Sequence, residues 1–136
     1  MELRGKQVLV TGGAGFIGSH LVDHLFDCSI RVLDDLSTGR KENLATAQAQ
    51  SKAEFVRGDV RDRSLVAELM RDTEVVFHLA CRGVRHSIGH PFKSHQVNAE
   101  GTLILLEEAR RASDHFPLLV DLRLPTEPSV TGLPSV

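Results

Sequence analysis

A glycine-rich stretch near the N-terminus constrains the fold more than any other part of the chain. Residues 7–20 read QVLVTGGAGFIGSH, in which a short apolar run leads through glycines into a helix-compatible segment. Gly12 permits a tight bend, Gly15 lets backbone N–H groups approach a pyrophosphate, and Gly18 lets the helix pack close to the strand. The unpaired N–H groups and the dipole at the start of a helix attract anions. The stretch therefore predicts a strand, a phosphate-binding turn and a helix.

An acidic residue after the second apolar run favours a dinucleotide as the ligand. A glycine triplet alone also occurs in ordinary turns that bind nothing. Here the run at 30–33 ends in Asp34, and a carboxylate at that place holds the adenosine ribose hydroxyls of NAD. The same carboxylate repels a 2′-phosphate, which favours NAD over NADP. Arg40 weakens this preference, because an arginine can serve a phosphate.

Alternating strand-like and helix-like segments predict a doubly wound parallel α/β sheet of the Rossmann type. Strands are expected at 7–10, 30–33, 53–57 and 75–79, and helices from 15 or 16 to 26 and at 41–51, 63–70 and 94–112. Asp62 is expected to cap the third helix. A fifth strand at 118–122 would complete an incomplete sheet of about five strands. Residues 1–112 are the expected NAD-binding domain, and residues 113–136 a divergent fifth strand and a proline-rich tail.

Two further segments are expected at the ligand. Asp59 follows the third strand and is a candidate partner for the adenine amino group, with Val60 packing on the ring. Small residues after the fourth strand would let the chain pass close to a nicotinamide and its ribose. Both segments leave the carboxyl edge of the sheet, where ligands of open α/β sheets bind.

Three histidines are candidates for a metal or a catalytic site. His20 and His24 are four residues apart on the first expected helix, but no third ligand is placed to complete a metal site. They are expected to be solvated surface residues, and no metal is expected. His78 lies inside the fourth strand, where a hydrogen-bonded core histidine is more common than a catalytic one.

Charge and cysteine usage exclude several other classes. The 136 residues carry a net charge of −2 at pH 7, and their basic residues are spread along the chain, which argues against binding to nucleic acid or a membrane surface. Cys28 and Cys81 are far apart in sequence, so neither a zinc site nor a disulfide framework is expected. No apolar run approaches the length of a membrane span. We expect a soluble, cytoplasmic protein.

Five short motifs together resemble one protein family. TGGAGFIGSH, LDDLSTG, GDVRD, FHLA and VNAEGTL, in this order and at these intervals, are similar to the N-terminal half of extended short-chain dehydrogenases/reductases. Over about residues 6–112 the chain most resembles nucleotide-sugar epimerases and dehydratases of the UDP-glucose 4-epimerase kind. The resemblance implies NAD as the cofactor. It implies cofactor contacts at Gly12, Gly15, Phe16, Ile17, Gly18, Asp34, Asp35, Ser37, Asp59, Val60, Leu79, Ala80, Arg82 and Asn98.

The chain departs from the resembled enzymes where their catalytic groups belong. In those enzymes the next strand ends in Ser or Thr and a Tyr-x-x-x-Lys helix follows, whose tyrosine is the acid/base for the sugar hydroxyl. This chain has no tyrosine and no lysine after Lys93. We therefore assign no catalytic residue and expect no turnover. Because the motifs stop abruptly after residue 112, we expect a frameshift or a premature stop near residues 113–117.

The partners follow from the same resemblance. A nucleotide sugar is expected to bind only in a complete enzyme. In the resembled family the helix at 94–112 and the next helix form a dimer interface, so apolar positions among residues 103–106 are expected to be uncovered and a homodimer through this helix is expected. A non-catalytic dinucleotide-binding or protein-interaction module is the alternative, and a fragment that does not fold stably alone is a third hypothesis.

Overall fold

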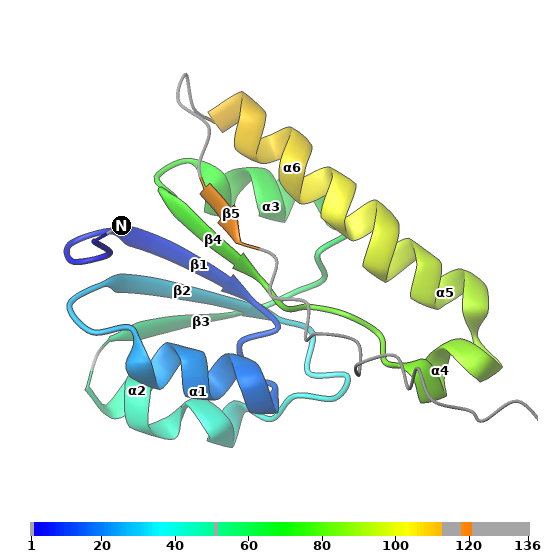
Figure 1. The fold of residues 1–136 in the computed structure, drawn as a ribbon, viewed down its shortest axis with the longest axis horizontal. Coiled ribbons are helices and arrows are strands. Elements are labelled where there is room, and N and C mark those ends of the chain that lie inside the picture. Colours follow the sequence, from blue (N-terminus) through cyan, green and yellow to red (C-terminus); the bar gives the residue numbers. More distant parts are fainter. Residues whose placement is uncertain (1, 51, 113–117, 121–136) are drawn as a thin grey trace, which may run out of the picture.

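A single parallel sheet runs through the middle of the molecule in the computed structural model, which describes residues 2–50, 52–112 and 118–120 (Figure 1). Its strands are β1 (Gln7–Thr11), β2 (Ser29–Asp34), β3 (Ala53–Arg57), β4 (Val75–His78) and β5 (Leu118–Val120). Their order in the sheet is β3-β2-β1-β4-β5, which is the strand order of a dinucleotide-binding sheet. The predicted parallel α/β fold is confirmed.

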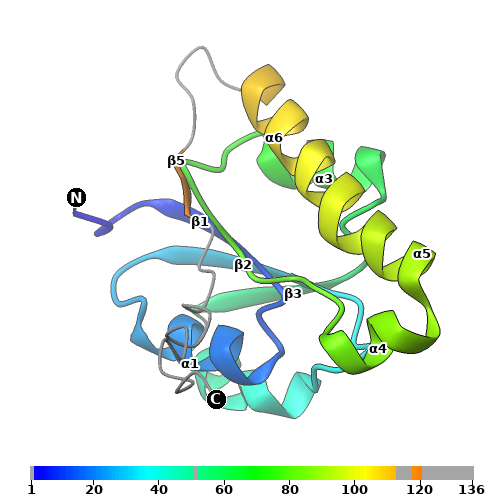
Figure 2. The ribbon, with the colours of Figure 1, turned by 45° about the vertical axis from the view of Figure 1, so that its right-hand side comes forward.

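Helical segments cover both faces of the sheet (Figures 1 and 2). They are α1 (Phe16–His24), η1 (Lys41–Leu44), α2 (Ala45–Ala49), α3 (Arg63–Met70), α4 (Val84–Gly89), α5 (Pro91–His95), η2 (Gln96–Glu100) and α6 (Gly101–Ala112). The helices α1 and α2 lie on one face, and α3 and α6 pack together on the other. Among the described residues, no helix has both the length and the apolar character that a membrane crossing requires.

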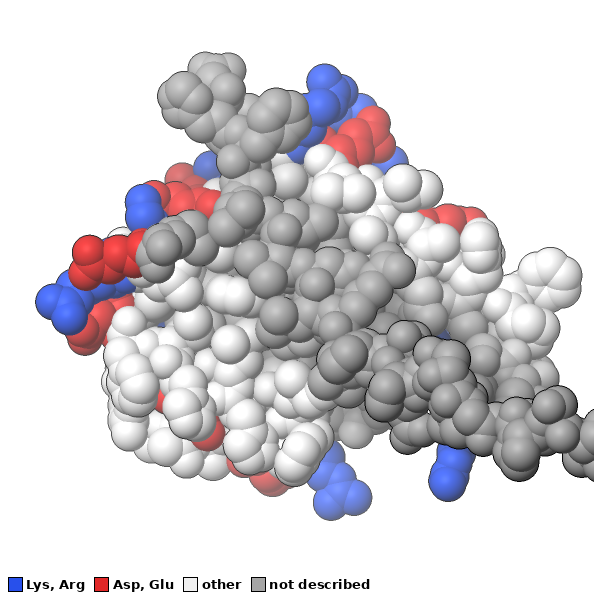
Figure 3. All heavy atoms as spheres, viewed as in Figure 1, with Lys and Arg blue, Asp and Glu red and all other residues white. Residues whose placement is uncertain are grey.

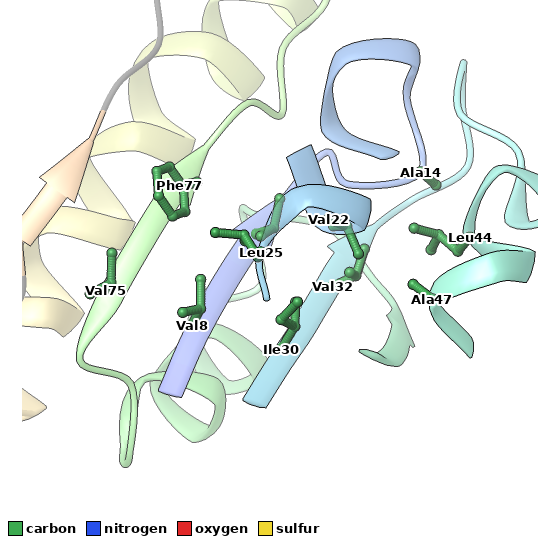
Figure 4. Close-up of a cluster of buried hydrophobic side chains, with 11 residues drawn as sticks. Val8, Ala14, Val22, Leu25, Ile30, Val32, Leu44, Ala47, Val75 and Phe77 are labelled. Atoms are coloured by element: carbon green, nitrogen blue, oxygen red, sulfur yellow. The ribbon is translucent and has the colours of Figure 1, made fainter. Parts of the chain in front are cut away.

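Two hydrophobic clusters fill the space between the sheet and its helices. Along β1 successive side chains point to opposite faces, as in any strand. Val8 (Figure 4) therefore joins the cluster under α1 and α2, as does Val10, whereas Leu9 joins the cluster under α3 and α6. Because both faces are covered, the central strands are apolar at nearly every position, which is the pattern of a buried parallel sheet.

The structure corrects two of the expected helices and adds one. The helix expected at 41–51 is a 3₁₀ turn, η1, followed by the short helix α2; only Leu44 and Ala47 are buried there, so little apolar surface supports a longer helix. The helix expected at 94–112 already begins at Pro91, because proline suits the first helical turn, and the π-helical turn η2 interrupts it. The unexpected helix α4 has no buried residue, and its two aliphatic side chains, Val84 and Ile88, are exposed.

Smaller differences concern the ends of elements. Helix α1 ends at His24, two residues before the expected end, because the backbone leaves the helical region at Leu25 and takes a left-handed conformation at Asp27. β1 and β2 extend beyond their expected ends, whereas β4 stops at His78. β5 pairs with β4 over residues 118–120, and the rest of the expected fifth strand lies outside the described residues.

The outer surface carries many ion pairs. Arg4 is paired with Glu2 and Asp27 near the start of the chain, and Arg111 is paired with Glu107 at the end of α6. On the face drawn in Figure 3, basic and acidic side chains lie beside one another at the left end and at the top. Charges of the two signs are therefore interspersed along these edges.

Candidate functional site

A cleft of about 690 Å³ lies at the carboxyl ends of β1, β2, β3 and β4. Ligands of open α/β sheets bind at this edge. The cleft is lined by every residue for which the sequence predicts a cofactor contact: Gly12, Gly15, Phe16, Ile17, Gly18, Asp34, Asp35, Ser37, Asp59, Val60, Leu79, Ala80, Arg82 and Asn98. The fold therefore gathers five separated motifs at one place.

The structure adds lining residues that the sequence analysis did not name as site residues. They are Leu33, Thr38, Gly58, His78, Cys81, Val97 and Thr102. Most of them are adjacent in sequence to a residue that the sequence analysis named. Extending each named segment by one residue would therefore have included them. Thr102 is the exception, because its place depends on how α6 packs against the sheet.

The glycines of the first turn have different roles. Gly12 has φ +69°, and a Cβ there would lie 2.7 Å from the Ala80 nitrogen. A Cβ on Gly18 would overlap the Gly12 carbonyl oxygen and lie 2.7 Å from the Gly13 Cα. The bend at Gly12 and the close helix packing at Gly18 are thus confirmed. At Gly15 a Cβ would approach only the Gly12 oxygen, at 3.2 Å, which leaves the space above the turn open to a ligand.

The N-terminus of α1 opens into this cleft without a side-chain cap. Gly15 is the N-cap, no side chain caps the helix, and the first turn contains no acidic residue. Phe16, Ile17 and Gly18 line the cleft with that first turn. The unpaired N–H groups and the positive end of the helix dipole favour an anion here.

Asp34 stands beside the glycine turn with its carboxylate fixed. Its side chain is buried; one oxygen accepts the Ala14 N–H at 3.0 Å and the other accepts the Leu36 N–H at 2.8 Å. A carboxylate offers about four acceptor sites, so capacity remains for the hydroxyls of a ribose. Arg40 does not line the cleft, and its backbone N–H donates to the Ala14 carbonyl.

Asp59 is held in its ionised form by Arg61. The Arg61 guanidinium Nη2 donates to Asp59 Oδ2 at 2.6 Å, and the Arg61 backbone N–H donates to Oδ1 at 2.8 Å. The side-chain hydrogen bond from Arg61 is the main cause that lowers the pKa of Asp59. Asp59 is therefore a carboxylate acceptor at neutral pH. Asp62 caps α3 as predicted, because its side chain accepts the Leu65 N–H at 3.1 Å.

The low pKa of Asp59 predicts a loss of stability in acid. A carboxyl group whose pKa falls on folding stabilises the fold above its unfolded pKa of about 3.9, and this contribution is lost as the pH falls through the lower folded pKa. Asp59→Asn has no such contribution. We therefore expect the urea midpoint of the parent chain to fall more steeply than that of the variant between about pH 4 and pH 2. Equal slopes in the two proteins would contradict the prediction.

His78 is a buried histidine with partners on both ring nitrogens. Its Nδ1 lies 2.6 Å from the Thr11 hydroxyl and its Nε2 lies 2.9 Å from the Thr102 hydroxyl. Because Thr102 donates its own proton to the Asn98 carbonyl, its oxygen must accept from His78. These donor and acceptor roles place the ring proton of His78 on Nε2. The prediction of a hydrogen-bonded core histidine is confirmed, although the same side chain also lines the cleft.

Asn98 anchors the segment that follows β4. Its amide oxygen accepts the Arg82 N–H at 2.7 Å, and its amide nitrogen donates to the Arg82 carbonyl at 3.1 Å. Asn98 belongs to the π-helical turn η2, and such turns occur frequently at functional sites. This double hydrogen bond fixes the cleft wall at the end of β4.

The remaining candidates lie away from the cleft. His20 and His24 are exposed on α1, as predicted, and each Nδ1 lies 2.7 Å from the carbonyl four residues earlier. Within the part of the chain that the structure describes, no three His, Cys, Asp or Glu side chains are grouped to hold a metal ion.

Comparison with known proteins identifies the family. The family model for GDP-mannose 4,6 dehydratase matches residues 9–119, which include the glycine turn, both aspartate segments and β4. The chain belongs to the GDP-mannose 4,6 dehydratase family. The resemblance to nucleotide-sugar epimerases and dehydratases is thus confirmed.

Three similar proteins are named as epimerases or dehydratases. A UDP-glucose 4-epimerase from Mycolicibacterium smegmatis is 47% identical over 110 residues, which are 78% of this chain and 35% of that protein. The dTDP-glucose 4,6-dehydratase DesIV from Streptomyces venezuelae, solved with NAD bound, is 38% identical with a TM-score of 0.74, over 78% of this chain and 36% of that one. The epimerase Mth375 from Methanothermobacter thermautotrophicus is 35% identical with a TM-score of 0.75, over 81% of this chain and 33% of that one. The chain thus spans about a third of the length of the relatives it matches.

Proposed function

We propose that this chain binds NAD in the cleft at the carboxyl edge of the sheet, as the cofactor-binding part of a nucleotide-sugar epimerase or dehydratase. One observation carries the proposal: the uncapped N-terminus of α1 and the buried carboxylate of Asp34 line the same cleft. An anion site beside a fixed hydroxyl acceptor matches the pyrophosphate and ribose of a dinucleotide. The similarity to an NAD-bound dehydratase supports the choice of ligand.

Each wall of the cleft has a proposed part in holding NAD. The first turn of α1 binds the pyrophosphate, and Asp34 accepts hydrogen bonds from the adenosine ribose. Asp59 accepts the adenine amino group, and Val60, which is 4% exposed, packs at the ring. Leu79 and Ala80 form the wall near the nicotinamide. In a complete enzyme, NAD held by these residues would supply hydride transfer at its nicotinamide ring.

Calorimetry with two cofactors tests the proposal. The parent chain is expected to bind one NAD, and to bind NADP more weakly, because Asp34 repels a 2′-phosphate. Equal affinities for NAD and NADP would overturn the role of Asp34, and failure to bind either would overturn the proposed function.

We propose sugar chemistry only for the complete protein and not for these residues alone. A nucleotide sugar is the proposed substrate there, because the family and its similar members carry such names. General acid/base catalysis at a sugar hydroxyl needs a positioned titratable group, and the tyrosine that serves this role in the resembled enzymes has no counterpart in a chain without tyrosine. The function proposed for these residues is therefore cofactor binding.

The free thiols of Cys28 and Cys81 agree with a cytoplasmic location.

We also propose that the outer face of α6 packs on a second copy of the chain. Leu103 and Leu106 are 64% and 44% exposed, whereas Leu105 is fully buried in the second cluster. Leu103 and Leu106 thus form the apolar surface among residues 103–106, the positions expected to be uncovered. Exposed apolar surface of this kind favours association.

A double substitution on α6 tests this association. Leu103→Glu with Leu106→Glu is expected to keep the chain monomeric at concentrations at which the parent associates, because charges oppose burial. Light scattering over a concentration series measures the change. Phe26→Glu is the matched control, since Phe26 is equally apolar and 63% exposed but follows α1. A parent chain that is monomeric at every concentration would contradict the proposal.

A further inference from the structure

An ion pair crosses the cleft from one strand end to another. Arg82 follows β4 and Asp35 follows β2, and the Arg82 Nη2 lies 2.7 Å from the Asp35 Oδ2. In the sheet β1 lies between these two strands (Figure 1). The glycine turn leaves the end of β1, so the two side chains meet across the place where the turn opens into the cleft.

Both ends of this ion pair are fixed by other hydrogen bonds. The Arg82 backbone is anchored by its two hydrogen bonds with the Asn98 side chain. The second carboxylate oxygen of Asp35, Oδ1, accepts the Ser37 N–H at 2.9 Å. The Arg82 side chain is only 9% exposed. The guanidinium is thus held over the cleft by one carboxylate, and that carboxylate is already engaged through both of its oxygens.

Besides the N-terminus of α1, Arg82 is the counter-charge that the described lining of the cleft offers to a diphosphate. Asp34, Asp35 and Asp59 contribute three carboxylates, and among the described lining residues Arg82 is the only lysine or arginine. An anion that enters a partly desolvated site needs a counter-charge. The planar guanidinium fork of arginine suits phosphate oxygens particularly well.

We propose that Arg82 exchanges partners when a ligand binds, leaving Asp35 for the diphosphate, and that Asp35 acts as a placeholder that keeps the guanidinium over the cleft. This inference rests on the proposed dinucleotide function and deepens it. It gives Asp35 an indirect role in place of a direct contact with the cofactor. A diphosphate carries more negative charge than one carboxylate, so the exchange is electrostatically favourable.

Calorimetry with ADP and adenosine isolates the diphosphate. Arg82→Met is expected to weaken ADP binding by about tenfold or more, the loss of one charged hydrogen bond, and to leave adenosine binding within about twofold. Arg82→Lys keeps the charge and should recover part of the ADP affinity. Arg85→Met is the matched control: Arg85 is exposed on α4, three residues along and outside the cleft lining, so its loss should change neither affinity.

Substitution of Asp35 is expected to change the ADP affinity in the opposite direction. Asp35→Asn releases Arg82 and is expected to tighten ADP binding several-fold. In the Arg82→Met background the same substitution should give a smaller gain, because no guanidinium is left to release. If the ion pair merely joins two loops, Asp35→Asn will instead weaken ADP and adenosine binding alike, which would overturn the inference.

The outcomes separate this inference from the proposed function. A parent chain that binds neither NAD nor ADP contradicts both. A parent chain that binds NAD, together with an Arg82→Met variant that binds ADP as tightly as the parent, contradicts only the exchange of partners. If thermal unfolding shows that Arg82→Met does not fold, the changes in ADP affinity of Arg82→Lys and Asp35→Asn test the exchange of partners instead.

Discussion

Gly18→Ala is expected to lower the free energy of unfolding by about 2 kcal/mol, because an overpacking cost of about 3 kcal/mol, the upper end of the usual range, is only partly offset by helix propensity. The added Cβ would overlap the Gly12 carbonyl oxygen and lie 2.7 Å from the Gly13 Cα. Both are backbone atoms of the turn, so neither can rotate away as a flexible side chain could. Alanine is a better helix former than glycine by roughly 1 kcal/mol, which offsets only part of this cost.

Gly15→Ala provides the matched comparison within the same turn. Its Cβ would approach only the Gly12 oxygen, at 3.2 Å, and the backbone φ of −73° suits any residue. We expect its stability to stay close to that of the parent, while NAD binding weakens by about tenfold, because the methyl group occupies the space above the turn. Urea unfolding and calorimetry measure the two effects. A Gly18→Ala variant as stable as the parent would show that α1 does not pack against the turn as described.

The sequence could predict the parts of the site that depend on local backbone chemistry. The bend at Gly12 and the close approach at Gly18 follow from what a Cβ would strike, and these constraints are visible in the spacing of glycines after an apolar run. The buried strands are equally visible, because a parallel sheet covered on both faces leaves continuous apolar segments. Asp62 at the start of α3 is also a local signal, since the cap acts within three residues.

The features that sequence reasoning missed depend on contacts between distant segments. Helix α4 has only six residues and buries none of them, so the pair of Val84 and Ile88 is too short a pattern to predict a helix. The pairing of Arg82 with Asp35 joins residues 47 positions apart, and it requires the strand order that places β1 between β2 and β4. The orientation of His78 likewise depends on Thr102, which α6 brings to the cleft. Such contacts follow from the packed fold and not from any short motif.

Asp34→Ala is expected to weaken NAD binding by about tenfold or more, because a charged hydrogen bond contributes about 1.5 to 3 kcal/mol. The substitution also removes the acceptor for the Ala14 and Leu36 N–H groups. Each partner left unsatisfied costs about 1 to 3 kcal/mol, so the variant should be less stable as well. A loss of NAD affinity could then follow from a disturbed turn and not from a lost contact with ribose.

Two comparisons separate these causes. Asp62→Ala removes a carboxylate of the same kind from the cap of α3, away from the cleft lining, and should cost about 1 kcal/mol of stability with no change in NAD affinity. The second comparison is the ratio of the NAD and NADP affinities of Asp34→Ala. A disturbed turn weakens both cofactors alike and keeps the ratio of the parent, whereas loss of the carboxylate that repels a 2′-phosphate moves the ratio toward one. A ratio that stays at the parental value, while NAD affinity falls, would show that Asp34 supports the turn and does not select the cofactor.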